Sequence, residues 1–204
     1  MSGDADAAAR LASAVLPTAD DLWGTAWSVD DDVDVDEGAT PGPFDPDEVP
    51  PGFPDDELLA DDAVSLEHPG PVLVHAVSAV FTDRAAASRA WTLLGDPVFV
   101  ERFLAGLAGD EAGEGEREVL GPVQSLPAFA ADRAGWRAAE HHAAWSVADG
   151  EALLPISVDM AVLLADRVVV VVWLAGPAGD ELEAGWRALL HRLELRCEAA
   201  LAAG

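Results

Sequence analysis

Hydrophobic and polar residues alternate with a period of two through much of the segment 153–174. From Leu154 to Leu164 every even position is apolar, whereas the odd positions include Ser157 and Asp159. This period is typical of a β-strand with one apolar face. Five consecutive valines, Val168 to Val172, come next. A run that is apolar on both faces predicts a central strand covered on both sides.

Two turn signals divide this region into a three-stranded meander. The strand expected over 136–147 precedes Asp149-Gly150, a dipeptide favoured in two-residue hairpin turns. A second tight turn is expected at Ala165-Asp166. With both turns two residues long, Val158 lies opposite Trp173 on an apolar face shared by all three strands. A slip of one residue would exchange the two faces.

The opposite face of the meander gathers the polar side chains Glu140, His142, Ser157 and Asp159. The predicted register sets Glu140 against Asp159 and His142 against Ser157, and two facing carboxylates raise one carboxyl pKa. An acid that orients a histidine, and a histidine that activates a serine, are parts of a hydrolytic site. No G-x-S-x-G turn exposes the serine, however. This face is therefore the candidate ligand-binding site, and a hydrolase that uses His142, Ser157 and Asp159 is the alternative.

The rest of the chain predicts further helices and strands around the meander. Helices are expected over 4–16, 84–94 and 97–108 and from Asp180 onward, and strands over 25–35 and 71–81. Residues 118–129 predict an edge strand or coil, and residues 37–71, which hold eight of the fourteen prolines, an irregular acidic arm. The order predicts one α+β domain over 1–204. Its antiparallel sheet has about five strands and ends in the meander, and N-terminal, central and C-terminal helices pack on it.

Charge is distributed unevenly along the chain. The net charge is −27, no lysine is present, and acidic residues outnumber arginine 19 to 1 in the first 70 residues. Phosphate contacts need clustered basic side chains, so nucleic acid and anionic membranes are disfavoured as partners. A basic protein or a small ligand remains the expected partner. A solvated acidic surface explains the same charge without any partner.

The sequence offers little for a metal, a cofactor or a targeting signal. Asp32, Asp34 and Asp36 begin a calcium-loop spacing, but Glu37 and Pro43 stand where the loop needs Gly and Glu. No cofactor is expected. One cysteine excludes an intrachain disulfide. No signal peptide or membrane-spanning run is evident, which predicts a cytoplasmic protein with no membrane insertion.

Several stretches resemble one group of small proteins. They are the opening A-R-L-A-S-A-V-L-P-T-A-D-D-L-W, the strand V-H-A-V-S-A-V-F-T-D-R, the helical D-P-V-F and the final V-V-V-V-V-W. Together they resemble actinobacterial sensor-domain and lipoprotein sequences, which are similar in fold to the PsbP/Mog1-like domains and to the extracellular sensor domains of mycobacterial Ser/Thr kinases. The chain departs from those sensor domains in lacking disulfides and a leader. The resemblance implies a non-enzymatic ligand- or protein-binding module, and it assigns no functional residue.

Three functions therefore stay open. The first is a non-enzymatic domain that binds a ligand or a protein. The second is the hydrolase described above. The third is an acidic mimic that sequesters a basic partner, which predicts salt-sensitive capture of a cationic protein.

Overall fold

The computed structural model describes residues 2–24, 26–29, 49–70, 72–111, 122–126, 136–149 and 152–203. Its helices are α1 (Ser2–Val15), α2 (Arg84–Leu94), α3 (Pro97–Glu111) and α4 (Asp180–Ala203), with short 3-10 turns η1 (Ala19–Asp21) and η2 (Asp55–Glu57). Its strands are β1 (Ser28–Val29), β2 (Leu58–His68), β3 (Val72–Phe81), β4 (Gln124–Leu126), β5 (Trp136–Asp149), β6 (Ala152–Ala165) and β7 (Val168–Pro177).

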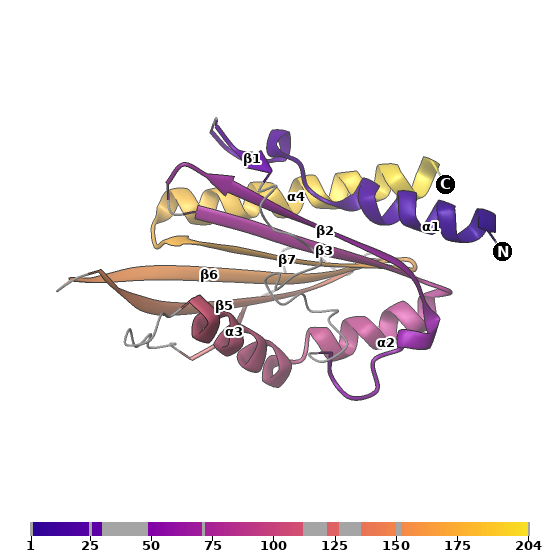
Figure 1. The fold of residues 1–204 in the computed structure, drawn as a ribbon, viewed down its shortest axis with the longest axis horizontal. Coiled ribbons are helices and arrows are strands. Elements are labelled where there is room, and N and C mark those ends of the chain that lie inside the picture. Colours follow the sequence, from indigo (N-terminus) through magenta and orange to yellow (C-terminus); the bar gives the residue numbers. More distant parts are fainter. Residues whose placement is uncertain are drawn as a thin grey trace.

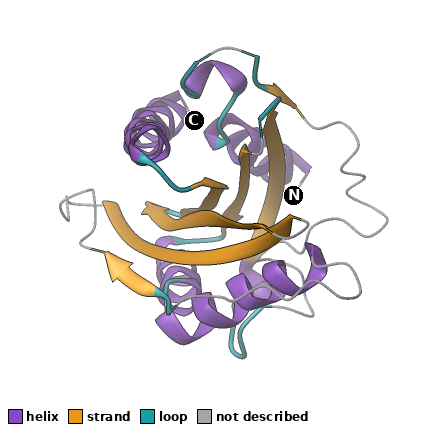
Figure 2. Ribbon diagram, turned by 90° about the vertical axis from the view of Figure 1, so that its left-hand side faces the viewer, coloured by secondary structure: helices purple, strands orange, loops and turns teal. Residues whose placement is uncertain are grey.

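The strands form a single antiparallel sheet between two layers of helices. Its order is β1-β2-β3-β7-β6-β5-β4, so the valine strand β7 lies at the centre. Helices α1 and α4 cover one face, and α2 and α3 cover the other (Figures 1 and 2). This arrangement confirms the α+β class, the antiparallel sheet with a C-terminal meander, and the helices packed against it.

The two faces of β7 supply two separate hydrophobic cores. Val168, Val170 and Val172 pack beneath α1 and α4, and Val169 and Val171 pack against α2 and α3. All five are buried, as the unbroken valine run predicts. Each core is completed by the apolar stripe of the helices that lie on it.

Local signals place the helix starts accurately. The carboxylate of Asp83 accepts a hydrogen bond from the backbone N–H of Ala86 at 2.9 Å, as an N-cap does. Helix α3 starts at Pro97, where a missing N–H costs no hydrogen bond. Helix α4 starts at Asp180, as predicted, and buries Leu182, Trp186, Leu189, Leu190, Leu193 and Cys197.

The structure differs from several predictions about strands and turns. The described sheet has seven strands instead of about five. Residues 58–68, expected within an irregular arm, form β2, because backbone pairing with β3 outweighs their polar side chains. Of the strand expected over 25–35, Ser28–Val29 is seen as β1, and residues 30–48 lie outside the described part of the chain. The last turn falls at Asp166-Arg167, one residue later than predicted.

That late turn has a backbone cause and a consequence for register. Asp166 has φ of 52°, a left-handed conformation that Asp tolerates better than most residues. Ala165 consequently pairs with Val168, and Asp149 pairs with Ala152 at the other hairpin. Moving each turn by one residue moves each pairing by two. The faces are therefore those predicted, while the opposing partners differ.

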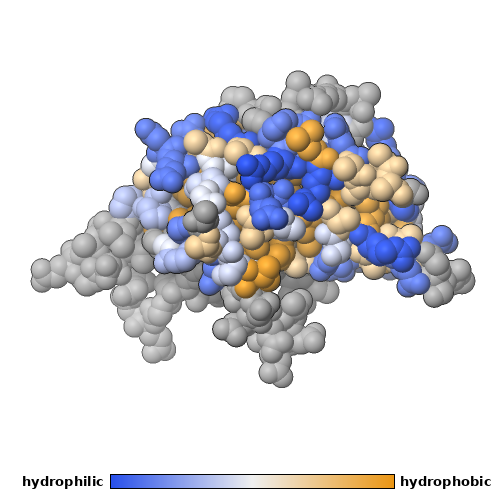
Figure 3. Space-filling model, turned by 90° about the horizontal axis from the view of Figure 1, so that it is seen from above, coloured by the Kyte–Doolittle hydropathy of each residue, from blue (hydrophilic) through white to orange (hydrophobic). Residues whose placement is uncertain are grey.

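None of the helices in the described part of the chain combines the length and hydropathy that a membrane-spanning segment requires. From above the layer of α1 and α4, hydrophobic side chains reach the surface in several small areas among hydrophilic ones (Figure 3).

Candidate functional site

The polar face of the meander brings together two of the four predicted residues, in a pairing other than the predicted one. His142 on β5 lies opposite Asp159 on β6, and the distance from His142 Nδ1 to Asp159 Oδ1 is 2.8 Å. Asp159 is buried, whereas His142 is partly exposed. The predicted register had set His142 against Ser157, so the observed pair follows from the shift of two positions.

The carboxyl group of Asp159 has a raised pKa. Burial is the largest cause and raises the pKa of Asp159 above its usual value. The hydrogen bond and charge of His142 oppose this rise, Glu183 on α4 adds to it, and Arg187 on α4 lowers the pKa. The predicted contact between Glu140 and Asp159 is wrong, because Glu140 lies opposite Ala161. Desolvation, and not a facing carboxylate, is therefore the main cause of the raised pKa.

Ser157 lies apart from the histidine. It is buried opposite Ala144, and no hydrogen bond joins it to His142 among the described residues. A serine nucleophile needs its base within hydrogen-bond reach. The structure thus provides an oriented histidine without an adjacent serine. The aspartates 32, 34 and 36 lie outside the described residues, and no group of three metal-ligating side chains occurs in the described part.

The histidines expected in the core are found there. His75 is buried, stacks on Trp173 with ring centroids 4.2 Å apart, and lies 2.6 Å from Ser65 Oγ through Nδ1. Burial lowers the pKa of His75 to about 4, which keeps the ring neutral at physiological pH. His141 is also buried, and burial is the largest cause that lowers its pKa. Neither histidine has the geometry of a metal site.

A pocket that the sequence did not predict lies beside the start of α4. It has a volume of about 300 Å³, and its walls are Trp23, Gly24, Trp27, His68, Gly70, Val72, Pro177, Glu181 and Leu182. These residues come from four places: the segment before β1, the turn between β2 and β3, the end of β7 and the first turn of α4 (Figure 1).

Aromatic rings form much of this aromatic pocket. Trp23 and Trp27 meet edge to face with centroids 5.3 Å apart, and His68 lies 5.2 Å from Trp27. The indole N–H of Trp27 donates to the carbonyl of Trp23 at 2.7 Å. Trp23, Trp27 and His68 are all partly exposed. The aromatic pocket therefore presents part of each ring to solvent.

The ring of Trp23 lies directly against the backbone of α4 at Gly185. A Cβ at Gly185 would lie 2.4 Å from the Trp23 ring, closer than any side chain permits, so glycine is required for this approach. Between the two tryptophans, Gly24 has φ of 75° and Ala26 has φ of 78°. A left-handed alanine costs about 1–3 kcal/mol and persists only where its surroundings impose it. With this strained backbone conformation between them, Trp27 lies beside Trp23.

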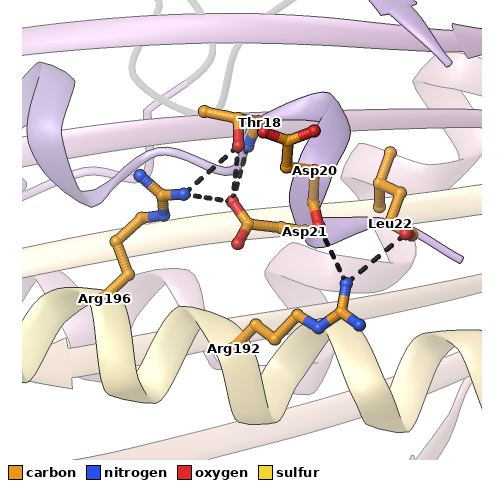
Figure 4. Close-up of polar contacts among 6 residues, drawn as sticks. All are labelled: Thr18, Asp20, Asp21, Leu22, Arg192 and Arg196. Atoms are coloured by element: carbon orange, nitrogen blue, oxygen red, sulfur yellow. Dashed lines mark hydrogen bonds and ion pairs between the residues drawn. The ribbon is translucent and has the colours of Figure 1, made fainter.

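Two arginines of α4 hold this segment in place, and we call them with their partners the arginine latch (Figure 4). Arg196 pairs with the carboxylate of Asp21 and donates to Thr18 Oγ1 at 3.2 Å. Arg192 donates to the carbonyls of Asp20 at 3.1 Å and Leu22 at 3.4 Å. The same Asp21 oxygen accepts from the N–H and hydroxyl of Thr18. The arginine latch thereby fixes the residues that lead directly into Trp23.

Two other hollows lack this construction. A groove of about 560 Å³ lies between the ends of α1 and α4 and is lined by Arg10, Arg167 and mostly small aliphatic residues. A hollow of about 570 Å³ along α2 is lined by residues such as Gly52, Ser88 and Thr92. Neither has an aromatic residue among its walls. Of these three hollows, the aromatic pocket is the one that is lined by aromatic rings.

A partial signal for the aromatic pocket exists in the sequence. The stretch L-W-G-T-A-W places two tryptophans four apart around a glycine, within a region too polar to bury both. Interpreting the tryptophans as core anchors is correct for Trp136, Trp173 and Trp186. Trp23 and Trp27 also pack against the core on the α1 and α4 side of the sheet, but both stay partly exposed, and their location depends on α4, more than 150 residues later in the chain.

The comparisons with known proteins find likenesses among solved structures alone. No protein-family model matches the chain, and no curated protein matches it. Among solved structures, the chain is similar to the extracellular domain of PknH from Mycobacterium tuberculosis, with 12% sequence identity and a TM-score of 0.38. The match covers 70% of this chain and 68% of that chain. At this TM-score the likeness carries no argument about fold or function.

Proposed function

We propose that the protein is a non-enzymatic binding domain whose ligand occupies the aromatic pocket. The observation that carries this proposal is the partly exposed pair Trp23 and Trp27 around a hollow of about 300 Å³. Pockets for small molecules begin at about this volume and are lined mainly by apolar and aromatic groups with a few polar ones. Rigid aromatic walls also lose little conformational entropy when a ligand binds.

The way the aromatic pocket is held supports a binding role. The arginine latch, the close approach at Gly185 and the strained Ala26 all act on the residues around Trp23 and Trp27. Simple burial of two tryptophans would need none of these features. Strained backbone persists where a site has to be arranged before its ligand arrives.

Solvent mapping in the crystal tests this proposal without knowledge of the ligand. Crystals soaked in concentrated isopropanol or dimethyl sulfoxide are expected to hold an ordered probe molecule in the aromatic pocket, against the rings of Trp23 and Trp27. A Trp27→Ala variant soaked in the same way is expected to lose that molecule. Probe molecules that gather in the groove at Arg10 and Arg167 while the aromatic pocket holds water would overturn the proposal.

The hydrolase is the second candidate, because the His142–Asp159 pair orients an imidazole as a catalytic acid does. A fluorophosphonate probe tests it directly. We expect no labelling of the native protein, since Ser157 is buried and has no hydrogen bond to His142. Labelling that disappears in a His142→Ala variant would establish the hydrolase and contradict the non-enzymatic proposal.

An acidic mimic differs from the aromatic-pocket proposal in what a partner would contact. A basic protein held by the acidic surface would bind with strong salt dependence. Its binding would be the same in the native protein and in Trp27→Ala. Binding to the aromatic pocket depends on that ring, so this one variant separates the two proposals.

A further inference from the structure

We infer that the ligand of the aromatic pocket is a small organic cation with an alkylated ammonium group. This inference rests on the proposed function and adds the chemical class of the ligand. The faces of aromatic rings carry negative charge density, and tryptophan attracts cations most strongly. Aromatic walls with a carboxylate beside them are the construction that recognises quaternary ammonium groups.

The charge of the aromatic pocket favours a cation. Glu181 is the one formally charged residue among those that line it. In the described part of the chain no cation pairs with Glu181, whereas its neighbour Glu183 pairs with Arg187. An acidic residue in a first helical turn is favoured by the helix dipole alone. What distinguishes Glu181 is its place on the wall of the pocket, beside the aromatic rings.

His68 adds a third ring to the walls of the aromatic pocket. The backbone N–H of Gly70 donates to His68 Nδ1 at 3.1 Å, which holds the imidazole in place. The ring therefore adds an aromatic surface near Trp27. Its role in the aromatic pocket is the same as that of the two indoles.

Other ligand classes fit less well. No arginine lines the aromatic pocket, so an anion would find the Glu181 carboxylate and no counter-charge. A neutral apolar ligand would pack against the rings but leave that carboxylate unpaired. One carboxylate and one histidine are too few to hold a metal ion. A volume of about 300 Å³ accommodates a compact group such as trimethylammonium.

Calorimetry with a matched pair of probes tests the charge requirement. Choline and 3,3-dimethylbutan-1-ol have the same shape, and only choline is charged. At equal ionic strength we expect choline to bind roughly tenfold more tightly than the alcohol, the fold-change that a partly desolvated cation–π contact provides. Equal binding of the two probes overturns the cationic class but leaves the proposed function standing.

Variants locate the choline site. Trp27→Ala is expected to abolish choline binding, and Glu181→Gln to weaken it several-fold without changing the affinity for the alcohol. Glu183→Gln is the matched control, since this residue lies two positions away on α4, pairs with Arg187 and lines no wall of the pocket. We expect its affinity for choline to equal that of the native protein. Thermal unfolding of each variant shows that it is folded.

The remaining outcomes are also decisive. Choline binding that survives in Trp27→Ala places the cation outside the aromatic pocket and overturns the inference. Equal losses in Glu181→Gln and Glu183→Gln would mean that only the general negative charge attracts choline, which also overturns it. If choline does not bind at all, the inference is wrong. Solvent mapping then decides separately whether the aromatic pocket binds ligands.

Discussion

At the residue scale, Gly185 is the position on which the aromatic pocket depends most directly. Substitution of Gly185 by Ala would push Trp23 away from α4, because the new Cβ would overlap its ring. Overpacking of this kind costs about 1–3 kcal/mol, which exceeds the gain of about 1 kcal/mol from removing a helical glycine. Urea unfolding should therefore show net destabilisation, together with reduced binding of choline.

Gly106 supplies the control for that substitution. It lies within α3, is exposed, and has no atom within 4 Å of the position of a new Cβ. Gly106→Ala should stabilise the protein by about 0.5–1 kcal/mol through helix propensity alone. A Gly185→Ala variant as stable as Gly106→Ala would contradict the close contact with Trp23.

His75 makes a separate prediction about pH. Its pKa is lowered from 6.5 to about 4 by burial, so the folded protein resists protonation that the unfolded chain accepts. The free energy of unfolding should fall as pH decreases from about 6.5 to about 4, by up to about 3 kcal/mol, and this contribution is present in full above pH 6.5. Denaturant unfolding measured at several pH values tests this.

A double variant, His75→Phe with Ser65→Ala, isolates the contribution of this histidine. It replaces the imidazole by a ring of similar size and removes the hydroxyl that would otherwise lose its partner. Other titrating groups, including Asp159, are present in both proteins, so the difference between the two stability curves reports on His75. A difference that stays constant between pH 4 and pH 6.5 would show that His75 is not protected from protonation.

At the element scale, α4 ties the N-terminal segment to the sheet through the arginine latch. Arg196→Met would keep the aliphatic part of the side chain and leave the mostly buried carboxylate of Asp21 without its cation. We expect a loss of about 1–3 kcal/mol in urea unfolding, as for other buried groups that lose a hydrogen-bond partner. Hydrogen exchange should become faster in residues 18–24, because the arginine latch holds them.

Arg187→Met is the matched control on the same helix. Its pair with Glu183 is exposed on both sides, with 58% and 68% of the side chains accessible, and such pairs contribute about 0–1 kcal/mol. We therefore expect little change in stability and none in the exchange of residues 18–24. Equal effects of Arg187→Met and Arg196→Met would argue that the arginine latch is an ordinary surface contact.

Elements whose signals are local could be predicted from the sequence, and elements that depend on distant partners could not. The cap at Asp83, the start of α4 at Asp180 and the valine strand follow from neighbouring residues. The sequence does not predict strand β2, because Asp61 and Asp62 interrupt its apolar pattern. Its conformation is imposed by pairing with β3 and by packing of α1, which no local period reveals.

At the scale of the whole molecule, the polar face of the meander could be predicted in part from the sequence, whereas the aromatic pocket could not. The sequence predicts that Glu140, His142, Ser157 and Asp159 share one face of the meander, and they do. Which of them lie opposite one another depends on the turns, which fall one residue later than predicted. The aromatic pocket joins residues from three distant parts of the chain, which the antiparallel pairing of β3 with β7 and the return of α4 bring together. They are Trp23, Gly24 and Trp27, then His68, Gly70 and Val72, and finally Pro177, Glu181 and Leu182. Such long-range pairing is set by the whole sheet and by no single stretch.

The measurement that tests this account most directly is a titration with tetramethylammonium chloride, observed through the indole N–H signals of the seven tryptophans by two-dimensional NMR. Trp23→Phe and Trp27→Phe assign the two signals of the aromatic pocket, and sodium chloride is the control for ionic strength. We expect these two signals to shift in a saturable manner while the other five stay in place. Saturable shifts at the other tryptophans, with those of Trp23 and Trp27 unchanged, would contradict it.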